Sequence, residues 1–216
     1  MLRISMLALS LSVMAVPCFA QRGGGGGGRP QTAVELVGVA EVQEELTATA
    51  EQKGKLNEIA AKVQEQRTAG RRGGRGQDAA ERAKQRAELA KKLTETFMPQ
   101  IAEVLQAEQV KRLHQISWQA MGALALQEEE VAKALELNQE AKDKITAAID
   151  DYNANAPGFG SDASRQERQA FVEKRDMAIM AALSDTQKEE FEELKGEEFD
   201  VSVLNRGRGG RRGSGN

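Results

Sequence analysis

Hydrophobic residues recur along this chain with the spacing of α-helices. Within residues 49–69, the positions of Leu56, Ile59, Ala60 and Val63 follow the i, i+3, i+4, i+7 rule, which places these side chains on one face of a helix. No segment alternates apolar and polar residues over the length of a strand, and no hairpin turn separates two β-branched runs. The pattern therefore predicts an all-α protein.

This helical periodicity, together with the residues that interrupt it, divides the chain into about eight helices. The predicted helices cover residues 39–46, 49–69, 78–105, 106–126, 128–135, 138–152, 162–183 and 184–199. Pro99 lies inside the third of them, where a proline removes one backbone donor, and it predicts a kink or a break. We expect a helical bundle or hairpin array without a β-sheet.

A five-residue pattern opens four of these helices. Each copy approximates Leu-Thr-x-x-Gln, in which a small polar residue precedes the helix and Gln or Glu stands three residues later. The copies read ATAEQ at 48–52, LQAEQ at 105–109, LNQEA at 137–141 and LSDTQ at 183–187. Capping of helix N-termini is the chemistry that this spacing predicts.

Two copies contain a complete capping box. The hydroxyl of Thr49 or Ser184 can accept a backbone N–H from the first turn of the helix. The side chains of Gln52 and Gln187, three residues later, can accept the N–H of the capping residue in return. A single capping box occurs in many helical proteins and says little about function. The four copies together are the informative feature.

The other two copies are incomplete. Asn138 can cap its helix, but Ala141 has no side-chain oxygen to return the bond. Gln106 is a poor capping residue, so Gln109 is expected to match the pattern in spacing only.

Residues around the copies recur at two fixed offsets. At an offset of 89, residues Glu41, Val42, Leu46, Glu51, Lys53, Lys55 and Leu56 correspond to Glu130, Val131, Leu135, Glu140, Lys142, Lys144 and Ile145. At an offset of 78, residues Ile101, Leu105, Gln109 and Leu113 correspond to Ile179, Leu183, Gln187 and Phe191. We interpret this as two pseudo-repeated halves, about 39–126 and 128–199, within a helical domain of 37–200.

The first twenty residues have the features of a secretory signal peptide. Arg3 supplies a positive charge, Leu7 to Val16 form an apolar core, and a small-residue exit ends at Ala20. We expect export and cleavage near Ala20, giving a periplasmic or extracellular protein. Cys18 follows a proline where a lipoprotein signal has a small residue, so acylation is the less favoured alternative.

Composition limits how the mature protein is stabilised. The chain carries a formal charge of −3, with 29% charged and 4% aromatic residues, and its one cysteine is Cys18. Disulfides are therefore excluded after cleavage, and stability must come from aliphatic faces of amphipathic helices. No segment is apolar for the roughly 18 residues that a membrane span needs.

Arginine and glycine dominate three segments outside the helices. Residues 21–36 read as a glycine-rich linker and residues 201–216 as a disordered tail. The segments 71–76 and 206–213 resemble RGG tracts but contain no aromatic residues for base stacking. Solvated linkers are the favoured interpretation, and binding of acidic polymers through these segments is the alternative.

The sequence shows no catalytic constellation, and we expect neither an enzyme nor a cofactor. His114 is the only histidine, and Met121 lies two helical turns away on the side that also carries Trp118. A soft-metal site would need further ligands that do not stand nearby. A partly buried histidine beside a core tryptophan is therefore preferred over a metal site.

With export, an all-helical pattern and four Leu-Thr-x-x-Gln-like helix starts, the chain resembles the LTxxQ motif family, the Spy and CpxP type of bacterial periplasmic proteins. The resemblance covers residues 39–199. It implies a small all-helical envelope-stress protein that acts as an ATP-independent chaperone or modulates a sensor kinase, and related members bind metals. Family members carry two motifs per chain and dimerise, whereas this chain carries four and is expected to be a monomer or a weak dimer.

The expected function is therefore that of a non-enzymatic binding protein of the chaperone or stress-adaptor type, whose partners are unfolded or envelope proteins. Four methionines are candidates to supply adaptable apolar surface for such clients, although filling of the core is the favoured interpretation for each of them singly. They are Met98, Met121, Met177 and Met180. A surface-interaction protein that binds acidic polymers is the alternative, and a metal sensor is less favoured.

Overall fold

The computed structural model describes residues 31–70, 79–157 and 162–206. These residues form helices joined by short connections, and none of them lies in a strand, so the all-α prediction is confirmed. Among the described helices, none combines the length and the apolar character needed to cross a membrane. The predicted signal peptide, most of the predicted glycine-rich linker and the Arg/Gly segments at 71–76 and 207–213 lie outside the described residues.

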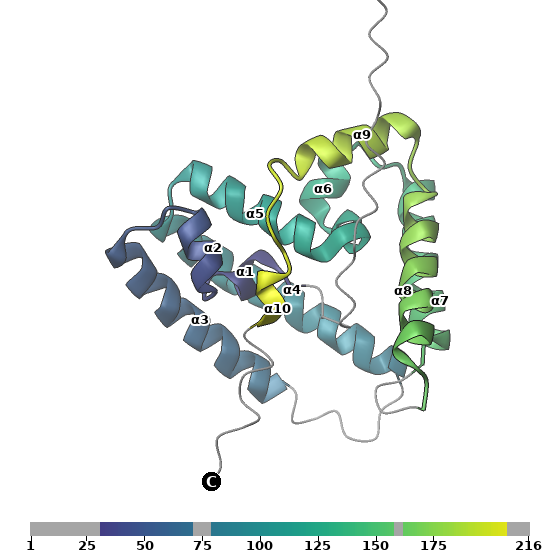
Figure 1. Cartoon of the computed structure of the whole chain (residues 1–216), viewed down its shortest axis with the longest axis horizontal. Coiled ribbons are helices and arrows are strands. Elements are labelled where there is room, and N and C mark those ends of the chain that lie inside the picture. Colours follow the sequence, from purple (N-terminus) through teal and green to yellow (C-terminus); the bar gives the residue numbers. More distant parts are fainter. Residues whose placement is uncertain (1–30, 71–78, 158–161, 207–216) are drawn as a thin grey trace, which may run out of the picture.

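The helices follow one another with few intervening residues (Figure 1). In chain order they are α1 (Ala33–Leu36), α2 (Ala40–Glu45), α3 (Ala50–Gly70), α4 (Ala79–Val104), α5 (Ala107–Met121), the 3-10 helix η2 (Gly122–Gln127), α6 (Glu129–Ala134), α7 (Gln139–Asn155), α8 (Arg165–Met180), α9 (Asp185–Leu194) and α10 (Val203–Arg206). The eight helices expected from the sequence correspond to α2 through α9. The predicted disordered linker (21–36) and disordered tail (201–216) are wrong where they include α1 and α10, because apolar side chains of these two helices are buried in the core.

Two of the predicted helices are too long at their C-terminal ends. The helix expected to reach residue 126 ends as α5 at Met121, because Gly122 adopts φ +59° and the chain continues as the 3-10 helix η2. The helix expected to reach residue 199 ends as α9 at Leu194, and Gly196 then adopts φ +67°. Glycine reaches these left-handed conformations without steric cost, so both glycines end helices.

The proline in α4 does not interrupt the helix. Helix α4 runs from Ala79 to Val104 with Pro99 inside it, so of the two predicted outcomes the break does not occur, and the kink stays a prediction. Pro99 is exposed, while the side chains of Leu93, Phe97 and Ile101 from the same helix are buried. Burial of that face holds the helix together despite the lost backbone hydrogen bond.

The first part of the chain packs around its own hydrophobic cluster. Helix α3 lies against α4, and α1 packs against α3, α4 and α5. Buried side chains of this cluster include Val34, Leu36, Leu56, Leu93, Phe97, Ile101, Leu113 and Ile116. We call this set, with the other buried residues that pack with it, the first cluster.

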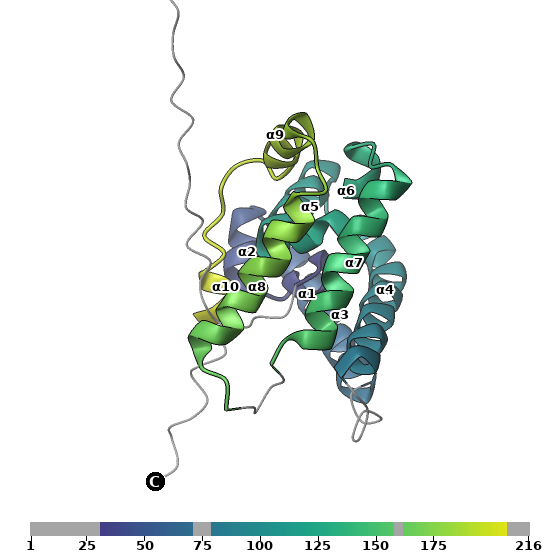
Figure 2. The same ribbon diagram turned by 90° about the vertical axis from the view of Figure 1, so that its right-hand side faces the viewer.

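The second part of the chain has a separate cluster. Helices α7 and α8 lie side by side, and η2 packs against both (Figures 1 and 2). The larger buried residues of this second cluster are Trp118, Leu126, Val131, Leu135, Leu137, Ile145, Ile179, Leu183 and Phe191. The two parts also meet directly, because α4 packs against α7.

The chain returns to the first cluster at its C-terminal end. After α9, residues 195–204 cross α5 and lead into α10, beside α1 (Figure 1). The side chain of Leu204 is 9% exposed and belongs to the first cluster. We call residues 195–204 the C-terminal strap, since it joins the last helix of the second part to the core of the first part.

Candidate functional site

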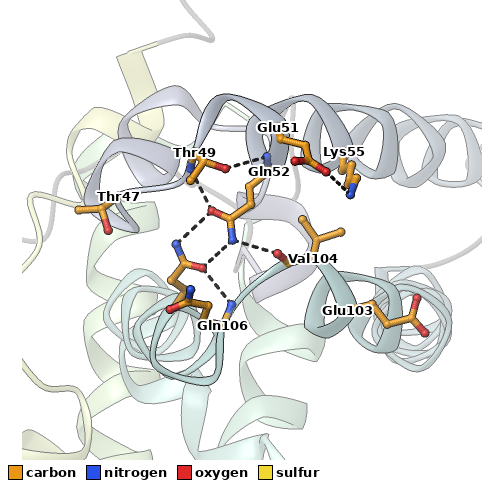
Figure 3. Close-up of a pocket in the computed structure, with 9 residues that line it drawn as sticks. Thr47, Thr49, Glu51, Gln52, Lys55, Glu103, Val104 and Gln106 are labelled. Carbon is orange, nitrogen blue, oxygen red and sulfur yellow. Dashed lines mark hydrogen bonds and ion pairs between the residues drawn. The ribbon is translucent and has the colours of Figure 1, made fainter.

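The helix start at Thr49 forms the predicted capping box. The Thr49 hydroxyl oxygen accepts the backbone N–H of Gln52 at 3.2 Å, and Gln52 Oε1 accepts the Thr49 N–H at 2.9 Å (Figure 3). Two backbone donors at the beginning of α3 are thereby satisfied, as the spacing predicts.

Gln109 forms a second helix-start contact. Its Oε1 accepts the N–H of Gln106 at 2.9 Å, so the expectation that Gln109 would match in spacing only is wrong. A long Gln at the third position can reach the N–H of the residue before the helix even when that residue lacks a good capping side chain.

The two glutamines bind each other across the junction of α3 and α5. Gln52 Nε2 donates to Gln109 Oε1 at 2.9 Å, and Gln109 Nε2 lies 3.4 Å from Gln52 Oε1. Each amide also donates to a main-chain oxygen. Gln52 Nε2 donates to the Val104 oxygen at 2.9 Å, and Gln109 Nε2 donates to the Leu46 oxygen at 2.8 Å. Both primary amides thus use their full donor capacity.

A polar depression of about 380 Å³ opens beside this amide pair (Figure 3). Its rim carries Glu51 and Lys55, whose charged groups lie 2.7 Å apart. Hydrogen bonding and charge attraction from Lys55 hold the pKa of Glu51 below its usual range. The depression is lined by side-chain amides, the hydroxyls of Thr47 and Thr49, this ion pair and the carboxylate of Glu103.

The fourth motif copy builds a similar start at α9. Ser184 Oγ accepts the Gln187 N–H at 3.2 Å, and Gln187 Oε1 accepts the Ser184 N–H at 3.0 Å. Gln187 Nε2 also donates to the main-chain oxygen of Leu135 at 3.0 Å. In the third copy, Asn138 Oδ1 accepts the N–H of Ala141 at 2.8 Å, as predicted.

These contacts follow the two sequence offsets. Gln109 binds the oxygen of Leu46, and Gln187 binds that of Leu135, where 187 − 109 = 78 and 135 − 46 = 89. The bound oxygens of Leu46 and Leu135 lie at the ends of α2 and α6, and these two helices end in the same way. The residues that follow, Thr47 and Glu136, both adopt φ 48°. Each of these residues occupies the left-handed position of a Schellman motif.

The backbone bonds of the two Schellman motifs match in detail. Thr47 N–H binds the Glu44 oxygen at 2.8 Å, and Ala48 N–H binds the Gln43 oxygen at 3.0 Å. The corresponding bonds 89 positions later run from Glu136 to Lys133 at 3.1 Å and from Leu137 to Ala132 at 2.9 Å. The sequence placed the ends of these two helices at residues 46 and 135, as the structure does to within one residue, but it did not indicate the Schellman motifs, because neither Thr nor Glu is the usual residue at a left-handed position.

The four methionines lie in different environments. Met98 is partly buried against the first cluster, and Met121 and Met180 are partly buried against the second. Met177 is 74% exposed, and it is the one large hydrophobic side chain with such exposure in the part of the chain that the structure describes. The four side chains therefore do not form one continuous apolar surface.

His114 is held by its neighbours within the protein. Its ring meets that of Trp118 edge to face with centroids 5.7 Å apart, and its Nδ1 lies 2.7 Å from Glu130 Oε2. The sulfur of Met121 faces the Ser117 hydroxyl at 3.7 Å. Within residues 31–70, 79–157 and 162–206, no three His, Cys, Asp or Glu side chains are grouped as metal ligands.

Comparisons with protein-family models, with curated proteins and with solved structures found no match to this chain.

Proposed function

We propose that this chain is an exported, non-enzymatic helical binding protein of the Spy and CpxP-like chaperone or stress-adaptor type. The sequence resemblance supplies the function. Its main structural support is that the motif glutamines at 52, 109 and 187 each join a helix start to a neighbouring part of the fold. The motif thus has an architectural role, and client binding is assigned to the helix faces that it arranges.

We further propose that the protein arose by duplication and combines two motif pairs in one chain. The recurrence of the Gln109–Leu46 contact as Gln187–Leu135 supports this proposal. Burial supports it as well. Leu56 and Ile145 correspond to each other at the offset of 89, and both are buried, with exposed fractions of 0% and 2%. A chain of this kind would function as a monomer where related proteins use a dimer.

Suppression of aggregation tests the proposed function. A disulfide-containing model client would be unfolded with a reductant, which leaves this protein intact because residues 21–216 contain no cysteine. We expect light scattering by the client to fall at a near-stoichiometric ratio and without ATP. Deletion of residues 207–216 should leave that effect unchanged, whereas unaltered scattering with the full chain would refute the chaperone function.

A further inference from the structure

The C-terminal strap is bound to α5 mainly through its own backbone. Gln119 Nε2 donates to the main-chain oxygens of Lys195 at 2.8 Å and Glu197 at 2.6 Å, and Gln119 Oε1 accepts the Phe199 N–H at 2.7 Å. Arg112 Nη1 adds a bond of 2.8 Å to the Glu197 oxygen. Because these bonds engage main-chain groups, they do not require any particular side chains in the bound segment.

Arg112 is oriented for this contact by another helix. Its Nε and Nη2 both donate to Glu45 Oε1 in α2, at 2.9 and 2.5 Å, while Nη1 remains directed at the strap. A guanidinium fixed by a carboxylate loses little further freedom when it binds a peptide oxygen. The donors that hold the strap are therefore prearranged by the first part of the chain.

Apolar side chains anchor the strap at four positions, of which the last two begin helix α10. Phe199, Val201 and Val203 are partly buried against the first cluster, and Leu204 is buried within it. Between α9 and α10 the strap has no regular helix, and Asp200 lies at a tight turn where the Val201 N–H binds the Phe199 oxygen at 2.8 Å. Between α9 and α10, backbone recognition combined with the apolar contacts of Phe199 and Val201 is a mode of binding a short, non-helical peptide segment.

The strap leaves α9 through a single constrained residue. Gly196 has φ +67°, and a Cβ atom at this position would lie 2.4 Å from Gln115 Nε2. Phe191, one turn before the end of α9, belongs to the second cluster, so the strap alone carries the chain into the first. A terminal segment held by two polar side chains and a few apolar ones belongs to the less stable part of a fold.

We propose that the surface of the first part beneath the strap is a binding site for short, non-helical apolar segments of unfolded polypeptides, and that the strap occupies this site in cis. The inference rests on the proposed function and names the surface that clients would take. With the strap in place, Met177 is the one exposed large apolar side chain among the described residues, so an apolar client site must be covered. Release of the strap exposes the client site.

Binding of a labelled peptide to two full-length variants tests the proposal. The peptide has the sequence of residues 197–205, EEFDVSVLN. In the first variant, Phe199→Ala, Val201→Ala and Leu204→Ala remove the anchors of the strap and leave the surface beneath it unchanged. In the second, Gly196→Ala places a Cβ at φ +67°, a backbone conformation that side chains rarely adopt, and the end of the Gln115 side chain must also move. Gly54→Ala is the matched control, since a Cβ there has no neighbour within 4 Å.

Fluorescence anisotropy should show that both strap variants bind the peptide at least about tenfold more tightly than the unaltered chain and the Gly54→Ala variant. The cis strap competes with the peptide at an effective concentration of about millimolar, which suppresses binding to the unaltered chain. Adding Gln119→Ala to the triple-alanine variant should weaken peptide binding at least about tenfold. A peptide with alanine in place of its Phe, first Val and Leu, the same three anchors, should not bind.

Absence of peptide binding by both strap variants would overturn the inference, as would equal binding by the unaltered chain. Exchange of straps between two copies, seen as a dimer that does not bind the peptide, would also overturn it. Light scattering of the client separates this inference from the proposed function. Suppression by the full chain without any peptide binding leaves the function standing without the strap site, whereas peptide binding without suppression leaves the site and refutes the chaperone function.

Discussion

Gln52 and Gln109 hydrogen-bond to each other through their side-chain amides, and each also accepts the backbone N–H that precedes its own helix. Helices α3 and α5 therefore begin at a shared contact although the two residues are 57 positions apart. Helix capping and tertiary packing are coupled here, because the same amide serves both.

A double-mutant cycle on this pair should show that coupling. We expect Gln52→Ala and Gln109→Ala each to lower the free energy of unfolding by about 1–3 kcal/mol, since each leaves partly buried donors and acceptors without partners. The double variant should lose less than the sum of the two, by about 0.5–3 kcal/mol. Urea unfolding followed by circular dichroism provides the three values, and additive losses would show that the pair is not coupled.

Gln109→Glu separates the two roles of the amide. Glutamate keeps an oxygen for the N–H of Gln106 but loses the donors to Leu46 and Gln52. We expect most of the loss seen with Gln109→Ala to remain in this variant. Recovery to the stability of the unaltered protein would mean that capping alone matters.

Ala141 occupies the position 89 residues after Gln52, and the second pair accordingly lacks one amide. We expect Ala141→Gln to raise the free energy of unfolding by about 0.5–1 kcal/mol, because two new hydrogen bonds exceed the side-chain entropy that a glutamine loses. The gain should require Gln187, so it should vanish in a Gln187→Ala background. Ala141 is 7% exposed, and a lower stability in both backgrounds would show that the longer side chain is not accommodated.

The helix starts could be predicted from the sequence because capping is local. Thr49 with Gln52 and Ser184 with Gln187 stand three residues apart, and that spacing alone defines their bonds. The bond from Gln109 to Leu46 spans 63 positions, and no local rule indicates which carbonyl a free amide hydrogen will find. Sequence reasoning thus found the residues of the site and missed the connections between them.

The helix ends show a second limit of local reasoning. Polar periodicity continues past Leu194 through a run of glutamates, so the sequence predicted a helix as far as residue 199. The structure ends α9 earlier because Gly196 turns the chain and the apolar side chains of Phe199 and Val201 pack on the first cluster. The end of α9 therefore depends on the first cluster, which is built by residues far earlier in the chain. The sequence of the strap alone does not indicate where that cluster lies.

Thr47 and Glu136 adopt a left-handed backbone conformation, so substitution of either residue by glycine should raise the free energy of unfolding. A side chain at φ 48° costs about 1–2 kcal/mol, and glycine removes that cost at the expense of a more flexible unfolded chain. We expect Thr47→Gly and Glu136→Gly each to raise the free energy of unfolding by about 0.5–1 kcal/mol. Glu44→Gly, inside α2, is the control and should lower it by about 1 kcal/mol.

Both glycine substitutions should be measured in the same thermal and urea unfolding experiments as the control. Because the two residues hold equivalent positions in the two Schellman motifs, their effects should agree in sign and be additive. A loss of stability at either position would show that its side chain makes a favourable contact that outweighs the backbone strain.

Glu128 predicts a dependence of stability on pH. Burial raises the pKa of its carboxyl above the ordinary 4.5, Glu130 adds to the rise, and the charge of His114 opposes it. The folded state therefore binds the proton more tightly than the unfolded state does. Stability from this group is fully present below about pH 4.5, falls as the pH rises through the folded pKa, and stays at the lower value above it.

Glu128→Gln removes this titration and should make the protein more stable at pH 7 by about 0.5–1 kcal/mol, the common scale for a partly buried substitution. The difference between the variant and the unaltered protein should shrink as the pH is lowered below 4.5, where Glu128 is protonated in both states. Urea unfolding at pH 4, 5.5 and 7 measures it, with Glu129→Gln as the matched exposed control. A difference that does not change with pH would mean that the substitution acts through packing at the start of α6, and a less stable variant at pH 7 would mean that attraction to His114 outweighs the cost of burial.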